Sequence, residues 1–391
     1  MTLEKPFLSS TLPEGVTSRF VDNSNGLKMH LLEAGSEDVE KPLVLLLHGF
    51  PELAYSWRKI IPLLAKAGYR VCAPDLRGYG RTLGWGPIKY EDDMSSFTLL
   101  NTVRDAIGLI RALGYSEVFS VVGHDYGASV AAWCALVRPD IFKRCALMSA
   151  PFDGPPKSPA VSRAEVVTQD MTDDIHSEMA KLSRPRKHYH WYYSTPAAND
   201  DMVNCSQGIH DFLRAYYHHK SADWLENQPH KLEAWKASEL EKMPTYYILD
   251  LNDTMPEAVA REMPSKLEIQ ANSWLTDQEL SIYAEEYTRN GFQGGLNWYR
   301  RGTTDMDIKS LEIFSGKTID VPSCFISGKS DWGVYQRPGA AERMNGHVCT
   351  KMLNFELIEG AGHWVQQEQP EKTAELLLKL SLIHISEPTR P

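Results

Sequence analysis

The chain has 391 residues, 42% of them hydrophobic and 24% charged, a globular composition that excludes a disordered or fibrous protein. Its formal net charge of -10 argues against a nucleic-acid surface or a basic membrane anchor, because both need clustered Lys and Arg. No apolar run approaches the roughly 18 residues of a membrane span, and the first residues do not form a signal peptide. We therefore expect a cytoplasmic protein with no membrane span and no nucleic-acid partner.

Residues 27–150 alternate short apolar, β-branched runs with longer stretches of helical period. This alternation predicts a parallel sheet whose strands are joined by crossover helices. The expected strands are 43–47, 69–73, 117–123 and 145–150. The expected helices are 57–67, 98–113 and 128–137.

The strand pattern stops near residue 153 and resumes after residue 305. The polar, helical sequence between is better explained by a cap inserted into one domain than by a second independent domain. Strands at 323–327 and 354–358, with helices around 340 and at 370–382, complete the predicted sheet. We therefore expect a core in two parts (1–152 and 306–382), a helical cap at 153–305, and a disordered or non-native tail at 383–391.

Residues 123–127 read Gly-His-Asp-Tyr-Gly and lie where an apolar strand is expected to end and a helix to begin. The form Gly-x-nucleophile-x-Gly is typical of a nucleophile elbow, a sharp turn that small residues at both ends make possible. Asp125 is the central residue. An aspartate here could instead cap the following helix, so the assignment depends on the rest of the site.

The type of nucleophile narrows the reaction. A carboxylate attacks saturated carbon by displacement and forms an alkyl ester, which water then hydrolyses at the aspartyl carbonyl. The expected substrates are therefore epoxides or alkyl halides, not esters. Hydrolysis of the ester also needs an activated water and an oxyanion hole.

Two later loops supply a base and its orienting acid. His363 follows the last expected strand, and Asp331 follows the strand before it. The chain order Asp125, Asp331, His363 is that of nucleophile, acid and base in an α/β-hydrolase fold. The predicted fold class is therefore this one, a mostly parallel sheet flanked by helices with an inserted helical cap.

The segment 48–52, His-Gly-Phe-Pro-Glu, directly follows the expected strand 43–47 and is typical of an oxyanion-hole loop. The backbone N–H groups of Phe50 and Tyr126 are expected to converge on the aspartyl oxygen as it becomes tetrahedral.

These segments resemble the soluble epoxide hydrolases of plants and vertebrates over residues 15–382. The resemblance rests on His-Gly-Phe-Pro-Glu-Leu at 48–53, Ser-Trp-Arg at 56–58, Asp-Leu-Arg-Gly-Tyr-Gly at 75–80, Gly-His-Asp-Tyr-Gly-Ala at 123–128 and Gly-His-Trp at 362–364. It implies conversion of a small hydrophobic epoxide and water to a vicinal diol. It also implies that Glu52 supports the hydrolytic water, with His48 and Trp57 as further supporting residues.

Opening an epoxide generates an alkoxide, which needs a proton donor opposite the nucleophile. The resemblance assigns this role to two cap tyrosines. Tyr299, in Gly-Gly-Leu-Asn-Trp-Tyr-Arg at 294–300, is similar to the second family tyrosine. Tyr189 is the candidate for the first, with Tyr192 and Tyr193 as alternatives. The cap looks longer than usual for the family, which leaves substrate size and pocket shape open.

No metal or cofactor is expected. His188 and His190 are closely spaced, but their Tyr-rich segment lacks the carboxylates or thiols that would complete a metal site. The six cysteines form no Cys-x-x-Cys pair and indicate buried free thiols in a reducing compartment. They are Cys72, Cys134, Cys145, Cys205, Cys324 and Cys349.

Two other functions stay open. Haloalkane and fluoroacetate dehalogenases also use an aspartate elbow, but haloalkane enzymes commonly have Trp where this chain has Tyr126, and no Arg lies beside Asp125. A non-catalytic ligand-binding protein could share the fold, since fold alone does not define function. The natural epoxide, the carbon attacked, the biological role and the choice between monomer and homodimer are likewise open.

Overall fold

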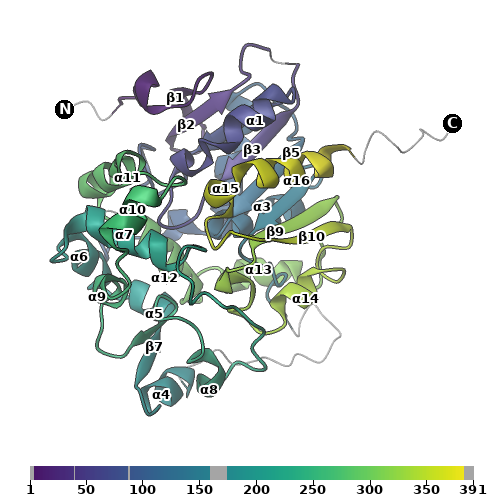
Figure 1. The fold of residues 1–391 in the computed structure, drawn as a ribbon. Helices are drawn as coiled ribbons and strands as arrows, with labels where there is room; N and C mark the ends of the chain where they lie inside the picture. Colours follow the sequence, from purple (N-terminus) through teal and green to yellow (C-terminus); the bar gives the residue numbers. More distant parts are fainter. Residues whose placement is uncertain (1–3, 39, 87–88, 159–173, 383–391) are drawn as a thin grey trace.

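The computed structural model describes residues 4–38, 40–86, 89–158 and 174–382, so the expected tail at 383–391 lies outside the described residues. An eight-stranded sheet forms the core (Figure 1). Its strands, in spatial order, are β1 (Thr17–Asp22), β2 (Lys28–Ala34), β4 (Arg70–Pro74), β3 (Leu43–Leu47), β5 (Ser120–His124), β6 (Cys145–Met148), β9 (Ser323–Gly328) and β10 (Met352–Ile358).

The burial of the central strands is typical of a parallel sheet. Every residue of β3, β4, β5, β6 and β9 is buried, and such near-continuous runs suit parallel strands covered on both faces. Neighbouring strands from β4 to β10 are parallel, whereas β2 pairs antiparallel with β1 and with β4. The predicted fold class, a mostly parallel α/β sheet, is confirmed.

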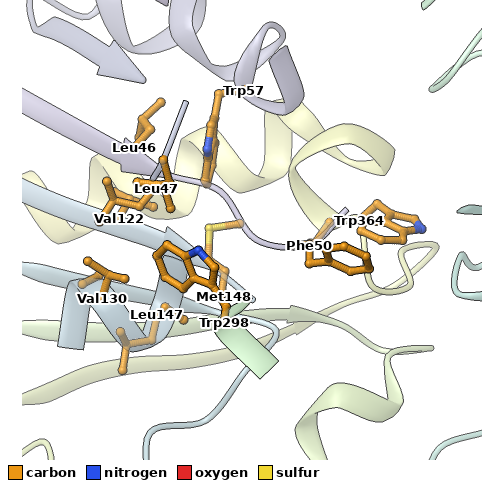
Figure 2. Packing of buried hydrophobic residues seen from close by; sticks show 14 of the residues in the cluster. Leu46, Leu47, Phe50, Trp57, Val122, Val130, Leu147, Met148, Trp298 and Trp364 are labelled. Carbon is orange, nitrogen blue, oxygen red and sulfur yellow. The ribbon is translucent and has the colours of Figure 1, made fainter. Parts of the chain in front are cut away.

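Helices cover this sheet. They are α1 (Ile60–Lys66), α2 (Leu99–Ala112), α3 (Tyr126–Val137), α14 (Ala340–Met344), α15 (Val365–Glu368) and α16 (Pro370–Leu382). Helix α3 packs on β5, β6 and α2, and α1 packs against α16. Figure 2 shows part of the buried cluster, where Val130 of α3 lies among strand residues such as Val122 and Leu147. Burial of α3 fixes the direction in which the chain leaves β5.

The segment between β6 and β9 gathers on one side of the core (Figure 1). Its elements are α4 (Asp174–Ala180), β7 (Arg186–His188), α5 (Tyr189–Tyr193), α6 (Ala198–Val203), α7 (Gly208–His219), α8 (Ala237–Leu240), β8 (Ile248–Asp250), α9 (Met255–Ala260), α10 (Lys266–Ala271), α11 (Asp277–Asn290), α12 (Gln293–Gly302) and α13 (Ile308–Leu311). Capping boxes begin α9, α10 and α11 at Thr254, Ser265 and Thr276.

Two glycines allow α12 to approach the core closely. A Cβ atom on Gly294 would lie 2.0 Å from the carbonyl oxygen of Gly78, and a Cβ on Gly78 would lie 2.6 Å from that of Gly294. Nearby, the Trp298 indole N–H donates to the Arg77 carbonyl at 2.9 Å. This contact seats the helix that carries Tyr299.

Most expected elements are present. Strand β3 spans the predicted 43–47, and α16 spans the predicted 370–382. Three features differ from the expectation. Strand β2, at Lys28–Ala34, is not among the expected strands. The antiparallel pair β7–β8 lies inside the segment expected to be wholly helical, and β1 lies before the strand pattern begins. Strand β1 is largely exposed and therefore lacks an apolar run.

The remaining short turns are 3₁₀ helices: η1 (Ser9–Thr11), η2 (Ala54–Trp57), η3 (Ser95–Phe97), η4 (Glu312–Phe314) and η5 (Trp332–Val334). Among the described residues, none of the helices combines the length and apolar character needed to cross a bilayer.

Candidate active site

Asp125 lies at a sharp turn between a strand and a helix. Strand β5 ends at His124 and α3 begins at Tyr126, while Asp125 itself has φ 53° and ψ −120°. Such a φ is strained for a residue other than glycine. A Cβ on Gly123 would lie 2.0 Å from the Gly127 carbonyl oxygen, so only glycine permits this turn. The Asp125 side chain makes no helix-capping hydrogen bond, which removes the capping alternative.

The Asp125 carboxylate faces the loop after β3. The Phe50 backbone N–H donates to its Oδ1 at 3.0 Å. A Cβ on Gly49 would lie 2.3 Å from the same oxygen, so glycine is needed for the loop to approach. The Tyr126 N–H, the other expected oxyanion donor, belongs to the first residue of α3, directly after the nucleophile.

His363 lies between two carboxylates. Its Nδ1 is 3.1 Å from Oδ1 of Asp331, and its Nε2 is 3.6 Å from Oδ2 of Asp125. Asp331 is held by the Ser327 hydroxyl at 2.9 Å and the Gly333 N–H at 2.7 Å. Within the described part of the chain, His363 Nε2 has no hydrogen-bond partner. The three predicted triad residues therefore meet, with Nε2 of His363 nearest the Asp125 carboxylate.

Neighbouring charges lower the pKa of Asp125 and raise that of His363. Burial alone would raise the pKa of Asp125, but the close approach and charge of His363, together with the charge of Lys220, lower it below the ordinary range. Burial and Lys220 lower the pKa of His363, but Asp331 and Asp125 outweigh them and raise it. Asp125 is therefore a carboxylate at neutral pH.

Tyr299 lies on α12 inside an aromatic group beside the nucleophile. Its ring centroid is 4.7 Å from that of Tyr126, 4.7 Å from Tyr193 and 5.3 Å from Phe50. Burial, reinforced by the negative charge of Asp125, raises the pKa of Tyr299 well above its ordinary value. The phenol therefore keeps its proton.

Tyr189 begins α5 and lies in the same aromatic group, with its ring centroid 5.8 Å from that of Tyr299. Its hydroxyl donates to Gln336 Oε1 at 3.0 Å and lies 2.9 Å from His190 Nε2. Burial raises the pKa of Tyr189 as well. The structure thus brings Tyr189 and Tyr299 together.

The two alternatives to Tyr189 differ from each other. Tyr192 donates its hydroxyl to Asp201 of α6 at 2.9 Å. Tyr193 packs against Tyr299, but its hydroxyl is buried without a hydrogen-bond partner among the described residues. Tyr192 is thus engaged elsewhere, while Tyr193 lies in the aromatic group.

Glu52 is fully buried and is not a surface residue. His124 Nδ1 lies 2.6 Å from its carboxylate, and Gln366 and Gln367 each donate to it at 2.9 Å. The other nitrogen of His124, Nε2, lies 2.7 Å from the carbonyl oxygen of His363. Because a carbonyl only accepts, this nitrogen is the donor. Glu52 is therefore linked to the base through His124.

The other two expected supporting residues lie farther from the chemistry. His48 Nε2 accepts the Leu76 N–H at 3.0 Å, and its Nδ1 donates to the Gly49 carbonyl at 2.9 Å, so it shapes the oxyanion loop. Burial lowers the pKa of His48 and keeps the ring neutral. Trp57 lies in the hydrophobic core near Leu47 (Figure 2).

Two residues at the site lie outside the sequence motifs. Lys220 directly follows α7 and is buried against the base loop, residues 359–364, which carries His363. Glu368 accepts the backbone N–H groups of Gly362, Trp364 and Ala222 at 2.8–3.0 Å. The only sequence signal for Glu368 is its position six residues after Gly362, at the end of α15. The only sequence signal for Lys220 is the aromatic residues near it in the chain.

Within the described residues, no group of three or more His, Cys, Asp or Glu side chains is arranged to hold a metal ion. All six cysteines are free thiols, and five of them are buried.

Comparison with known proteins places the chain in a family. The family model described as alpha/beta hydrolase fold matches residues 42–370. Epoxide hydrolase A of Mycobacterium tuberculosis is 34% identical, covering 92% of this chain and 96% of its own length. Epoxide hydrolase 3 of Siraitia grosvenorii is 30% identical, covering 90% and 93%. The solved structure of potato (Solanum tuberosum) epoxide hydrolase I has a TM-score of 0.70 at 28% identity, covering 93% and 98%.

The fold and the elbow define an α/β hydrolase. Within that class, the chain belongs to the epoxide hydrolase family. The resemblance inferred from the sequence motifs is confirmed.

Proposed function

We propose that the chain converts a small hydrophobic epoxide and water to a vicinal diol through an ester on Asp125. The observation that carries the proposal is a carboxylate at a nucleophile elbow, with His363 Nε2 at 3.6 Å and the Phe50 N–H at 3.0 Å. A carboxylate displaces at saturated carbon, so the strained oxirane is a fitting substrate. No cofactor takes part in this scheme.

In the first step, ionised Asp125 attacks one oxirane carbon and the C–O bond breaks. The oxygen leaves as an alkoxide and takes a proton from Tyr299 or Tyr189. Both phenols are protonated at neutral pH because burial raises their pKa values. Tyr193 is the alternative to Tyr189, supported by its contact with Tyr299.

In the second step, neutral His363 takes a proton from water, which attacks the aspartyl carbonyl. The N–H groups of Phe50 and Tyr126 stabilise the oxyanion. Asp331 stabilises the imidazolium that forms, through its contact with Nδ1. Collapse of the tetrahedral intermediate breaks the ester C–O bond, and His363 returns its proton to the departing oxygen, which releases the diol. The proton left on the Asp125 carboxyl restores the tyrosine that was ionised in the first step. Glu52 supports this water indirectly, through His124.

We also propose that residues 153–305 are a cap over a core formed by 1–152 and 306–382. Strands β6 and β9 are direct neighbours in the sheet although this segment separates them in sequence. The aromatic lining from both parts suits an apolar epoxide. The buried free thiols support a cytoplasmic location.

The decisive experiment is mass spectrometry of the His363→Gln protein after incubation with styrene oxide and, separately, with a bromoalkane. We expect an epoxide-sized addition on the peptide that contains Asp125, and none in the Asp125→Ala, His363→Gln double variant. An adduct from the bromoalkane alone would instead indicate a dehalogenase. No adduct with either reagent, in a folded protein, would contradict both.

A further inference from the structure

We propose that Lys220 is a positioning residue that acts through His363. Its backbone holds the base loop against the cap, and its positive charge keeps His363 neutral for the hydrolysis step. The role rests on the proposed function, because it concerns the second step of that reaction.

The backbone contact is direct. Lys220 follows the end of α7, and its carbonyl oxygen accepts the N–H of His363 at 2.9 Å. A Cβ on Gly362 would lie 2.6 Å from the same carbonyl oxygen, so the base loop can approach only because glycine stands there. The cap therefore touches the base loop at the residue that carries the imidazole.

The Lys220 ammonium group is surrounded by aromatic rings, and the residue is only 3% exposed. Its Nζ lies 4.8 Å from the ring centroid of Tyr247, 5.3 Å from Tyr216, 5.4 Å from Trp364 and 5.6 Å from Tyr246. Rings at such distances attract a cation electrostatically.

Direct carboxylate pairing does not explain the burial of this lysine. Among the described residues, no ion pair or hydrogen bond involves its Nζ. Its charge therefore acts on the site without being cancelled by a partner in contact.

The charges around His363 show why a cation is useful there. The titratable groups that face His363 or Lys220 come from several elements and are Asp125, Asp331, Glu52, His124, Glu368, Tyr216, Tyr246 and Tyr247. Two carboxylates in contact with an imidazole favour its protonated form, which cannot accept a proton from water. Lys220 opposes them and lowers the pKa of His363.

This balance changes during the reaction. Once Asp125 is esterified it carries no charge, so His363 is then influenced mainly by Asp331 and Lys220, which have opposite signs. Formation of the ester therefore favours the neutral imidazole of His363 at the step in which it must accept a proton from water. Burial lowers the pKa of Lys220 and the facing carboxylates oppose that shift, with a net pKa of about 8, so the cation is present at neutral pH.

The test is the titration of the His363 ring by NMR in the wild-type protein and in Lys220→Met, with the resonance assigned from His363→Gln. We expect the pKa of His363 to rise by about 0.5–1 unit without the cation. The acid limb of the ester-hydrolysis rate should move upward by the same amount. Lys220→Arg keeps the charge and should restore the wild-type profile.

Lys59→Met is the matched control. Lys59 is a half-buried lysine between core and cap that donates to the Trp274 carbonyl at 2.9 Å, and the triad is not among the groups that shift its pKa. It should leave the His363 titration unchanged. If the Met variant does not fold, Lys220→Gln serves as the second charge-free variant.

An unchanged His363 titration in a folded charge-free variant would overturn the electrostatic role. Because the titration needs no substrate, this failure is distinguishable from failure of epoxide hydrolysis, which the adduct on Asp125 tests separately.

Discussion

At the residue scale, the roles of the cap phenols are the part of the mechanism most open to direct measurement. The Tyr299 ring packs on Tyr126, next to the nucleophile, and Tyr189 lies beside it. Two donors that share one alkoxide can partly replace each other. Loss of one tyrosine should therefore leave residual ring opening, whereas loss of both should abolish it.

We predict that Tyr299→Phe lowers the rate of ring opening by about 100-fold and leaves residual activity, because a general acid contributes roughly that factor or more. The measurement is single-turnover formation of the Asp125 ester. Tyr192→Phe is the control, since that hydroxyl donates to Asp201 within the cap. A Tyr299→Phe protein with wild-type ring opening would contradict the assignment.

The pH dependence of the two steps should separate. The pKa of Asp125 is lowered and that of His363 is raised, so as pH falls His363 becomes protonated long before Asp125 does. In the ester Asp125 no longer raises the pKa of His363, but Asp331 still does, so we predict that ester hydrolysis is lost at a higher pH than ring opening is. Acid-quenched single turnovers followed by intact-protein mass measure both steps. Loss of the two steps at the same pH would be inconsistent with this scheme.

At the element scale, the approach of α12 to the core determines where Tyr299 lies. Gly294 is in the first turn of α12 and Gly302 ends the same helix. A Cβ at Gly294 would collide with the Gly78 carbonyl at 2.0 Å, whereas a Cβ at Gly302 would meet nothing within 4 Å.

We therefore predict that Gly294→Ala reduces ring opening at least about 10-fold and lowers the free energy of unfolding by roughly 1–3 kcal/mol, because the backbone must shift. Gly302→Ala should keep its activity and be neutral or slightly stabilising. Urea unfolding and initial rates compare the two. Equal behaviour of both variants would show that the close approach does not position Tyr299.

At the scale of the whole molecule, Arg58 joins the proposed cap to the core. It is 2% exposed and donates to Glu279 at 2.8 Å, to the Trp274 carbonyl at 3.0 Å and to Gln367 at 2.6 Å. Removing the guanidinium leaves these acceptors without their donor in a buried site.

Arg58→Met should therefore cost about 2–4 kcal/mol of unfolding free energy. Arg138→Met is the matched control, because its ion pair with Asp140 is exposed and should change stability by less than about 0.5 kcal/mol. Equilibrium urea unfolding checks both. If Arg58→Met loses no more unfolding free energy than the control, the stability of the protein does not depend on these Arg58 contacts.

Local patterns of burial explain which elements could be predicted from the sequence. Burial on both faces leaves continuous apolar runs, so β3 and β5 were readable as strands, whereas β1 and β7 are short or exposed and carry no such run. Tyr189, Tyr192 and Tyr193 lie within five residues of sequence, and only the folding of α5 directs the Tyr192 hydroxyl to Asp201.

The sequence by itself determined the fold class, the elbow at Asp125 and the chain order of the triad, because each depends on local periodicity or on small residues at fixed spacing. Only the tertiary structure decided that Lys220 and Glu368 adjoin the base loop, that Glu52 is linked to His363 through His124, and that Gly78 meets Gly294. Apart from those of Glu368 with the base loop, these contacts join residues far apart in the chain, and no local pattern encodes them because they form only when distant elements pack together.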